Sequence, residues 1–505
     1  MMDGSNIMAG RFSLLELFHP DGSANTSLVL GSNCPDLFQP EPPVAPGQHA
    51  ELFILAPTPG ECSTGGWLEA ATYVLACQLA ADGVGYILAP RRWRFKITRL
   101  LHRHGLLLEL PIGHIPDWAS SPYLVPLTTT PAHYAFSTLL SMPSWKGNLA
   151  GLWIGLPGAT QVLSYLGPSV GLIFRRPGAR PLFKWLFTLG AKSGRPGRVI
   201  MRTNWRGQDG AVVLYRFSQS DTQPAAVAKV APVMTSAANH VREAMALSHL
   251  GAGACSAGAR VPRVLLLAQK GNYSVLLQST IFGRPAAELL SSQPSQLASF
   301  IERLVSWLEN WHRATLVVRP LDEIKLHRTL LVPVTQLAPL LEQGEEYCHW
   351  LSRRCHAATD ASMPLVATHN DLTMANVLFD EDNTLGIVDW ETGREDGFPL
   401  VDFFYALTDA VMVSRGDRNR LEAFKACFAP GGVHTATAAR LQAHLASVIG
   451  VPAAIIKLCF HACWLHHAIN EHHTSRSADA RPFLSIVQWL ALHHSISEED
   501  HAQAF

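Results

Sequence analysis

Three polar side chains are spaced along residues 369–391 in a way that suits phosphoryl transfer. Asp371 lies five residues before Asn376, and Asp389 follows the apolar run Leu385–Val388 after a polar turn. One carboxylate would orient or deprotonate an acceptor hydroxyl, whereas a carboxylate and an amide oxygen suit Mg²⁺ held against nucleotide phosphates. A loop followed by a hairpin would bring the three side chains together. The spacing therefore predicts a phosphoryl-transfer site, and the alternative is an acidic turn beside a buried strand.

This stretch resembles the catalytic core of the aminoglycoside phosphotransferase and choline kinase superfamily, whose fold is that of the protein kinases. The resemblance is carried by Thr368-His-Asn-Asp371, by Val388-Asp-Trp-Glu391 and by Val401-Asp-Phe403. Two positions depart from the family pattern: Asn370 replaces a usual glycine, and Gly397-Phe-Pro-Leu400 replaces a usual Asp-Pro. Neither departure removes a reactive group.

The resemblance implies catalytic and metal-binding roles for four of these residues. Asp371 would act on the acceptor hydroxyl, and His369 is grouped with it as a catalytic-loop residue that braces the loop. Asn376 and Asp389 would coordinate Mg²⁺ between the β- and γ-phosphates of ATP.

Two more residues near the site are expected to be structural. Asp402 would brace the catalytic loop from the following helix, and the alternative for it is a solvated helix cap. Glu391 would either face the substrate or the metal, or have a purely structural role.

Apolar and aromatic runs upstream predict the strands of a β-rich lobe. Lys229 stands in one of these runs, where a charge needs a partner. The helical periodicity over residues 239–250 offers Glu243 as that partner. By the resemblance, Lys229 would bind the α- and β-phosphates of ATP; the alternative is an edge-strand lysine with a solvated ammonium group. The runs are Arg198–Thr203, Ala211–Phe217, Ala225–Val230, Val261–Leu267 and Tyr273–Gln278.

Two further segments are assigned to the nucleotide. The loop 204–210 contains Gly207 and Gly210, whose backbone would approach phosphate oxygens closely, although any tight turn uses such glycines. By the resemblance, adenine would dock against the backbone of residues 278–282, which include Gln278 and Ile281.

The predicted fold class is α+β. It is a protein-kinase-like two-lobe fold, with a β-rich N-lobe and a helical C-lobe, preceded by a small α/β domain. Amphipathic helices are expected at about 295–316 and 335–357. The expected limits are 1–150 for the α/β domain, 151–195 for an apolar segment and basic linker, 196–280 for the N-lobe and 281–505 for the C-lobe.

The N-terminal region alternates strand and helix patterns over residues 50–115, which predicts a parallel sheet. It is loosely similar to the C-terminal half of class I methyltransferases, as if truncated. The one candidate for a cofactor-binding turn, Ser27–Asn33, contains a single glycine. We therefore expect residues 1 to about 190 neither to bind S-adenosylmethionine nor to be needed for phosphoryl transfer.

Residues 149–174 carry no charge, whereas residues 175–198 hold seven Arg or Lys and no acid. Such a pairing occurs beside membrane segments, but glycines and prolines interrupt the apolar run. A buried sheet edge followed by a basic linker is favoured, and membrane contact is the less favoured alternative.

Composition restricts the class of protein. The chain has 505 residues, 48% hydrophobic and 16% charged, with formal net charge +0. These values predict two or three globular domains and argue against nucleic-acid binding. The nine cysteines have no framework spacing and the N-terminus has no signal-peptide pattern, so a reduced, cytoplasmic location is expected.

The leading hypothesis is an ATP- and Mg²⁺-dependent phosphotransferase acting on a hydroxyl of a small molecule, which would be a sugar, an amino alcohol or a natural product. The alternatives are a non-catalytic nucleotide-binding scaffold or regulatory protein, and a degenerate methyltransferase fusion. Acceptor specificity should lie in residues 400–505, which are histidine-rich and only modestly acidic. Polycationic acceptors favour clustered carboxylates, so aminoglycosides receive only modest support.

The same region contains a set of possible zinc ligands. Cys459, Cys463 and either His466 or His467 would share a helix face. Cysteines at this spacing are also common in hydrophobic cores, which is the favoured interpretation.

Overall fold

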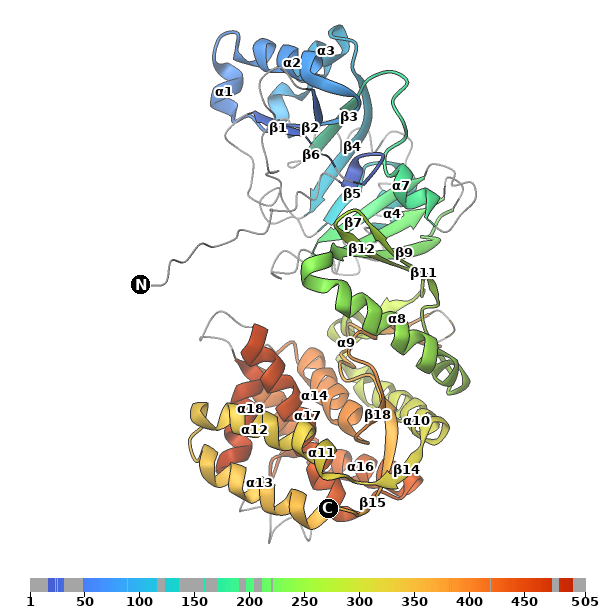
Figure 1. Ribbon diagram of the computed structural model, residues 1–505, viewed down its shortest axis with the longest axis vertical. Helices are drawn as coiled ribbons and strands as arrows, with labels where there is room; N and C mark the ends of the chain where they lie inside the picture. Colours follow the sequence, from blue (N-terminus) through green and yellow to red (C-terminus); the bar gives the residue numbers. More distant parts are fainter. Residues whose placement is uncertain are drawn as a thin grey trace. The chain divides into compact units, whose positions relative to one another are not determined.

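The computed structural model contains two compact units (Figure 1). One comprises Met1–Val241 and Val264–Thr280, and the other comprises Arg242–Arg263 and Ile281–Phe505. The first is rich in strands and the second in helices, which confirms the predicted α+β class. The residues that the structure describes are 17–22, 24, 26–30, 49–88, 90–115, 123–135, 159, 170–189, 197–203, 211–218, 221–380, 382, 384–417, 419–474 and 481–493.

The first unit is built on a mixed sheet of 11 strands. β1, β2 and β3 are parallel to one another, and every other neighbouring pair is antiparallel. In sheet order the strands are β1 (Ser27–Leu30), β2 (Ala50–Leu55), β3 (Leu79–Leu88), β6 (Val170–Arg175), β4 (Leu107–Ile115), β5 (Tyr123–Pro126), β7 (Arg198–Thr203), β8 (Val212–Phe217), β9 (Ala226–Pro232), β12 (Tyr273–Ser279) and β11 (Val264–Lys270).

The expectation of a wholly parallel N-terminal sheet is wrong. β6 inserts antiparallel between β3 and β4, so these two strands run in the same direction without being neighbours. β6 comes from the segment expected to be an apolar edge and linker, and all six of its residues are buried in the middle of the sheet. The uncharged residues Val170–Phe174 therefore belong to a central strand, whose two faces are both covered.

Helices cover the two faces of this sheet. α2 and α3 pack on the face that includes Phe53, Ile87 and Phe174, as Figure 1 shows for the strands near the N-terminus. α7 packs on the other face, together with residues 17–18. The helices of this unit are α1 (Pro59–Ser63), α2 (Trp67–Gln78), α3 (Arg94–Arg103), which follows the 3₁₀ turn η3 (Arg91–Trp93), α4 (Thr129–Tyr134) and α7 (Lys184–Thr188).

The basic residues at the start of the expected linker 175–198 form ion pairs within this unit. Arg175 is buried and its Nη1 lies 3.0 Å from Oε2 of Glu109. Arg180 lies between two carboxylates, with Nη2 2.7 Å from Asp21 and Nε 2.6 Å from Asp82. These contacts join three distant parts of the sequence at the sheet. They give the basic run a structural role that its composition did not indicate.

The strands expected for the N-lobe are present, with ends displaced by up to three residues, as β7, β8, β9, β11 and β12. They continue the N-terminal sheet, because β5 pairs with β7 through Leu124 and Met201. One buried cluster includes Ile54 of β2, Val199 of β7 and Val275 of β12. The expected domain limits stay a prediction, but the two regions share a sheet and a core.

The second unit is mainly helical. Its strands form one sheet in the order β10, β17, β16, β13 and another in the order β14, β15, β18. They are β10 (Ala259–Arg260), β13 (Arg284–Pro285), β14 (Val317–Pro320), β15 (Ser362–Thr368), β16 (Val377–Phe379), β17 (Leu385–Ile387) and β18 (Arg394–Gly397). The helices are α8 (Val233–Ser256), which begins in the first unit, α9 (Ala286–Ser292), α10 (Leu297–Thr315), α11 (Glu323–Leu326), α12 (Val332–Leu337), α13 (Gly344–Ala358), α14 (Val401–Ser414), α15 (Arg420–Phe428), α16 (Thr435–Ile449), α17 (Ala453–Thr474) and α18 (Pro482–His493), with short turns η5 (Pro294–Gln296), η6 (His327–Leu331) and η7 (Ala338–Leu340).

The helix expected at 335–357 is in fact interrupted. α12 ends at Leu337, a 3₁₀ turn containing Pro339 follows, and α13 begins at Gly344. Proline has no N–H to donate and its ring disfavours a preceding helical turn. A Cβ at Gly344 would lie 2.1 Å from the Ala338 carbonyl oxygen, so the close approach of the two segments requires glycine.

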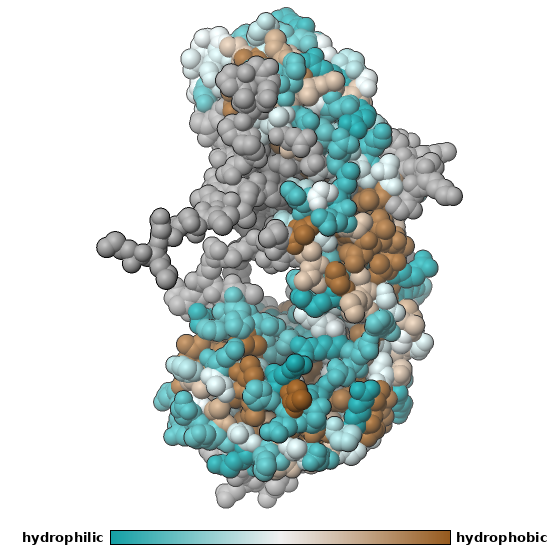
Figure 2. Space-filling view, in the orientation of Figure 1, coloured by the Kyte–Doolittle hydropathy of each residue, from teal (hydrophilic) through white to brown (hydrophobic). Residues whose placement is uncertain are grey.

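Among the described residues, no single helix is long and apolar enough to cross a membrane. Thr435–Ile449 and Ala453–His473 pass that test only as a pair, with a bend of 115° between them. Surface hydrophobic residues are found instead on the edge strand β11, where Leu265 and Leu267 are 49% and 39% exposed. Figure 2 shows hydrophobic surface beside β9 and β11.

We predict that removing residues 1–190 prevents the remaining chain from folding. The cut exposes the edge of β7 that pairs with β5, and it uncovers core residues such as Val199 and Met201. Full burial of each such side chain stabilises a fold by about 1.5–3 kcal/mol. Size-exclusion chromatography and thermal unfolding should show aggregates without a cooperative transition.

A chain that begins at Leu17 is the matched control, because it keeps every described residue, and it should unfold cooperatively. A monomeric, cooperatively unfolding chain that begins at Ala191 would contradict the shared core.

Candidate active site

The loop between β15 and β16 brings together the side chains expected to perform the chemistry. Nδ2 of Asn376 donates to both the carbonyl and the carboxylate of Asp371, at 2.9 and 3.0 Å. The Val388 amide donates to the carbonyl of Asn376 at 3.0 Å, which places the residue before Asp389 beside the loop. The loop and the β16–β17 hairpin therefore hold Asp371, Asn376 and Asp389 at one site.

The electrostatics of Asp371 indicate a crowded acidic site. Burial raises its pKa, and the negative charge of Asp389 raises it further, to about 7. The hydrogen bonds from Asn376 and Tyr405 act in the opposite direction. A buried carboxylate with a raised proton affinity suits a group that accepts the proton of a hydroxyl.

His369 positions the loop and does not face the acceptor. Its ring is buried, with Nε2 donating to the Val388 carbonyl at 3.0 Å and Nδ1 accepting from the Asp371 amide at 3.3 Å. The ring also packs edge-on against Trp390, at 4.8 Å between centroids. Both ring nitrogens bind backbone, so the geometry agrees with the expected bracing role, in which His369 holds Asp371 in place.

Two residues of the site adopt left-handed backbone conformations. Asn370 has φ of 61° and Asp389 has φ of 70°. Asn and Asp tolerate this region better than other non-glycine residues, because a short polar side chain bonds locally. This explains why Asn370 replaces the usual glycine without loss of the loop, and its Nδ2 donates to the Thr392 carbonyl at 3.0 Å.

Asp402, at the start of α14, binds the catalytic loop. Its two carboxylate oxygens accept from the backbone amides of His369 and Asn370, both at 2.7 Å. The side chain is buried, and burial raises its pKa to about 6 in spite of the two amide hydrogen bonds, which lower it. Glu391 is partly buried in the turn after Trp390.

A second buried acid supports the loop from α14 and was not recognised in the sequence. Oδ2 of Asp409 accepts from the Met374 amide at 2.8 Å. Its Oδ1 lies 2.9 Å from Nη2 of Arg420. The available signal was the seven-residue spacing between Asp402 and Asp409, which places both on one face of the helix.

An open hollow of about 340 Å³ lies beside Asp371. The loop contributes Asn370, Asp371 and Thr392 to its lining. The helices α14, α17 and α18 contribute the rest of the lining: Tyr405, His466, His467, Asn470, Glu471 and Phe483. Because this hollow ends at the carboxylate proposed to accept the hydroxyl proton, it lies where the substrate that receives the phosphoryl group would have to bind.

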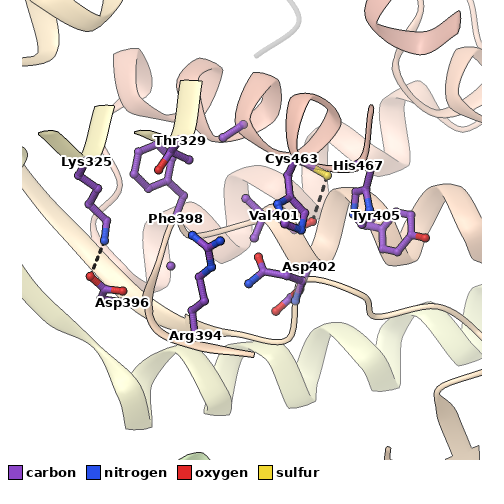
Figure 3. Close-up of a pocket in the computed structure, with 14 residues that line it drawn as sticks. Lys325, Thr329, Arg394, Asp396, Phe398, Val401, Asp402, Tyr405, Cys463 and His467 are labelled. Carbon is purple, nitrogen blue, oxygen red and sulfur yellow. Dashed lines mark hydrogen bonds and ion pairs between the residues drawn. The ribbon is translucent and has the colours of Figure 1, made fainter. Parts of the chain in front are cut away.

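A narrower cavity of about 50 Å³ adjoins this hollow and shares Asn370, Tyr405, His466 and His467 with it. Figure 3 shows Tyr405 and His467 side by side at one end of the cavity and the Lys325–Asp396 ion pair at the other. Sγ of Cys463 donates to the Val401 carbonyl at 3.4 Å.

The zinc alternative receives no support. Among the residues that the structure describes, no group of three or more His, Cys, Asp or Glu side chains is arranged to hold a metal ion. Cys459 and Cys463 are both buried, and burial raises the pKa of each thiol, so neither is a ready thiolate ligand.

A Mg²⁺ ion at Asn376 and Asp389 would depend on fewer protein ligands. The Asp389 carboxylate and the Asn376 amide oxygen are hard donors, and Nδ2 of Asn376 is already bonded to Asp371. Nucleotide phosphates and water would complete the coordination, as is usual for Mg²⁺. The residues present therefore fit Mg²⁺ bound together with a nucleotide.

The residues assigned to the nucleotide lie in both units. Lys229 is half-buried on β9 between Val213 and Leu276 of the neighbouring strands, and Gln278 is buried on β12. Gly207 and Gly210 lie outside the described residues.

In the second unit, Glu243 is buried on α8. A Cβ added to Gly386 would lie 2.5 Å from Cγ2 of Ile281, so Ile281 packs on the strand that leads to Asp389. The nucleotide-binding roles of all these residues stay predictions.

Comparison with known proteins gives one family match. Residues 207–443 match the model of a family described as the phosphotransferase enzyme family. No protein among the curated sequences matches the chain.

Solved structures of low similarity also align. Aminoglycoside phosphotransferase APH(3'')-Id from Streptomyces rimosus is 18% identical over 51% of this chain and 89% of its own, with a TM-score of 0.33. A thermostable mutant of aminoglycoside phosphotransferase APH(4)-Ia, in complex with AMP-PNP and hygromycin B, is 14% identical over 62% of this chain and 98% of its own, with a TM-score of 0.40. TM-scores this low do not support a functional interpretation, which therefore depends on the family match and the site residues.

We predict that Asp402→Asn destabilises the loop and lowers turnover. One oxygen that accepts a backbone amide becomes an NH₂ donor, so a buried N–H loses its partner. Such a loss costs about 1–3 kcal/mol. Differential scanning calorimetry should show a lower Tm, and the unfolding free energy should fall by that amount.

Asp360→Asn is the matched control, because Asp360 is exposed and has φ of 63°, which asparagine tolerates. Wild-type stability of the Asp402→Asn variant would contradict the bracing role.

Proposed function

We propose that the protein is an ATP- and Mg²⁺-dependent phosphotransferase that acts on a hydroxyl of a small molecule, because residues 207–443 match the model of the phosphotransferase enzyme family. The observation that carries the proposal is the contact of Asp371 with Asn376 beside an open hollow, with Asp389 close enough to raise the pKa of Asp371. A proton acceptor and a hard-cation site are thereby combined at one point.

The proposed reaction assigns a separate task to each residue. Bound Mg²⁺·ATP supplies the γ-phosphoryl group, whose bond to the β-phosphate oxygen breaks as its bond to the acceptor oxygen forms, leaving ADP. Asp371 orients the acceptor hydroxyl and accepts its proton. Asn376 and Asp389 hold the metal, and Lys229 binds the α- and β-phosphates with Glu243 as its partner.

The bracing residues explain how the acid stays in place for this chemistry. His369 fixes the backbone amide of Asp371, and Asp402 fixes the two amides before it. Asp409 holds the amide of Met374, on the other side of Asp371. A loop held at this many points keeps the carboxylate within reach of a bound hydroxyl without further ordering.

We predict that Asp371→Asn lowers kcat by about 10²- to 10⁴-fold, the usual contribution of a general base. Mg²⁺·ATP affinity should change little, because this carboxylate faces the acceptor. The measurements are ADP release with the acceptor and calorimetric titration of Mg²⁺·ATP. Asp360→Asn serves again as the control. Turnover of the Asp371→Asn variant within about threefold of wild type would reject the assignment and favour a non-catalytic scaffold.

We predict that Asp389→Asn weakens nucleotide binding itself, because it removes a charged ligand from Mg²⁺. Asparagine suits the left-handed backbone at this position, so the loss of charge is tested without backbone strain. The Kd for Mg²⁺·ATP should rise by about tenfold or more, which corresponds to about 1.4 kcal/mol. The Kd for ATP in excess EDTA should be the same for variant and wild type. Unchanged, Mg²⁺-dependent affinity in the variant would count against this ligand.

A further inference from the structure

The wall of the hollow beside Asp371 is formed by stacked rings. Tyr405 of α14 lies on His467 of α17, with centroids 3.8 Å apart and planes inclined by 24°. His467 in turn lies on Phe483 of α18, at 5.0 Å and 23°. Tyr405 and Asp371 line the same hollow. The proton acceptor is therefore adjacent to a continuous aromatic surface.

This surface is held in place by a buried ion pair. The Arg420 guanidinium lies 5.3 Å from the centroid of Tyr405 and 4.8 Å from that of Phe483. Arg420 is paired with Asp409, which also accepts from the Met374 amide of the catalytic loop. The ring wall and the loop that carries Asp371 thus share one support, and their spacing is fixed before any acceptor binds.

The lining offers little negative charge to a cation. Its acids are Asp371 and Glu471. Oε2 of Glu471 accepts from the backbone amides of Phe483 and Leu484, at 3.1 and 2.9 Å, and so caps α18. Asp371 would accept the proton of the reacting hydroxyl and lies beside the metal ligands. The described lining therefore holds no cluster of carboxylates available to several ammonium groups.

The histidines of the lining add neutral polar groups. Burial, together with the positive charge of Arg394, lowers the pKa of His466 to about 4. Burial also lowers the pKa of His467, with additional contributions from His466 and Arg420. Both rings are thus uncharged at neutral pH, and the two arginines oppose additional positive charge nearby.

Directional hydrogen-bonding groups complete the hollow. Nδ2 of Asn470 lies 3.2 Å from Nε2 of His466, so the amide donates to a neutral ring and Nδ1 of His466 carries the ring proton. Asn470, His466 and Thr392 together present amide, imidazole and hydroxyl groups to the hollow. Such groups recognise hydroxyls by geometry and not by charge.

We infer that the acceptor is an uncharged, hydroxylated ring compound, such as a monosaccharide or a cyclitol. One face of its ring would pack on the surface formed by Tyr405, His467 and Phe483, with hydroxyls directed to Asn470 and His466 and one hydroxyl to Asp371. This inference rests on the proposed phosphotransferase function. It excludes polyamines and polycationic aminoglycosides as preferred acceptors, because their ammonium groups would be desolvated without carboxylate partners.

The test uses the full chain and measures ADP formation from Mg²⁺·ATP with matched acceptor sets at millimolar concentration. One set contains neutral ring polyols (glucose, galactose, ribose and myo-inositol), the second contains aminoglycosides (kanamycin and neomycin), and the third contains choline. At least one neutral ring polyol should raise ADP formation well above the rate without acceptor, and the other two sets should not. Preferential stimulation by the aminoglycosides or choline, or no stimulation by any neutral polyol, overturns the inference.

Two substitutions in the lining test whether the residues of the hollow determine the preference for neutral acceptors. Phe483→Leu should raise KM for the neutral acceptor by about three- to tenfold with kcat nearly unchanged, because ring stacking contributes about 0.5–1.5 kcal/mol beyond buried area. Phe95→Leu, at an exposed position of α3, is the matched control and should leave KM unchanged.

Asn470→Asp adds one negative charge without added volume, and it should lower kcat/KM for the neutral acceptor while raising it for kanamycin. Unchanged acceptor kinetics in both lining variants also overturn the inference.

A separate measurement distinguishes failure of this inference from failure of the proposed function. Mg²⁺·ATP should raise the Tm of the wild-type chain and of each variant, which shows that they are folded and bind nucleotide. Nucleotide binding with preferential turnover of cationic acceptors rejects the acceptor class alone. Absence of both Mg²⁺-dependent binding and turnover rejects the phosphotransferase itself, and the inference with it.

Discussion

The site depends on a buried carboxylate that binds the catalytic loop from outside it. Asp402 accepts from two successive loop amides, and its raised pKa shows that burial outweighs the benefit of those hydrogen bonds for the charge. A charge is kept in such a place only if the surrounding structure requires it. Here the requirement is the turn at Asn370, whose left-handed backbone exposes two amides that no strand or helix satisfies. The geometry of Asp371 follows from that turn.

The same helix joins the loop to the acceptor hollow. α14 contributes Asp402 and Asp409 to the loop and Tyr405 to the aromatic wall. Arg420 neutralises Asp409 and packs against the same wall, so one charged pair supports both sides of the reaction site. Because the supports are shared, a change on α14 would affect chemistry and acceptor binding together. Effects on KM without an effect on kcat are therefore expected from residues of α17 and α18.

The N-terminal region shares one sheet with the rest of the first unit, which its composition did not indicate. β6, drawn from an uncharged segment, lies in the middle of the sheet, and the basic residues after it are paired with Glu109, Asp21 and Asp82. The sheet then continues through β5 and β7 into the strands that carry Lys229 and Gln278. The methyltransferase resemblance of this region stays a prediction. Its shared core gives the region a role in folding, whatever else it binds.

The sequence by itself determined the local features of this protein. It predicted β7, β8, β9, β11 and β12 within three residues, and it predicted that Asp371, Asn376 and Asp389 lie together, because strands and a loop–hairpin motif are encoded by residues close together in the chain. It also indicated a resemblance to a phosphotransferase family, and residues 207–443 match the model of the phosphotransferase enzyme family.

Only the tertiary structure decided how distant segments meet. The antiparallel insertion of β6 and the support of the loop by Asp409 both depend on partners far along the chain. The aromatic wall is the clearest case, because Tyr405, His467 and Phe483 come from three helices and have no shared spacing. Periodicity reports which face of an element is buried, but it does not report against which residues that face will pack.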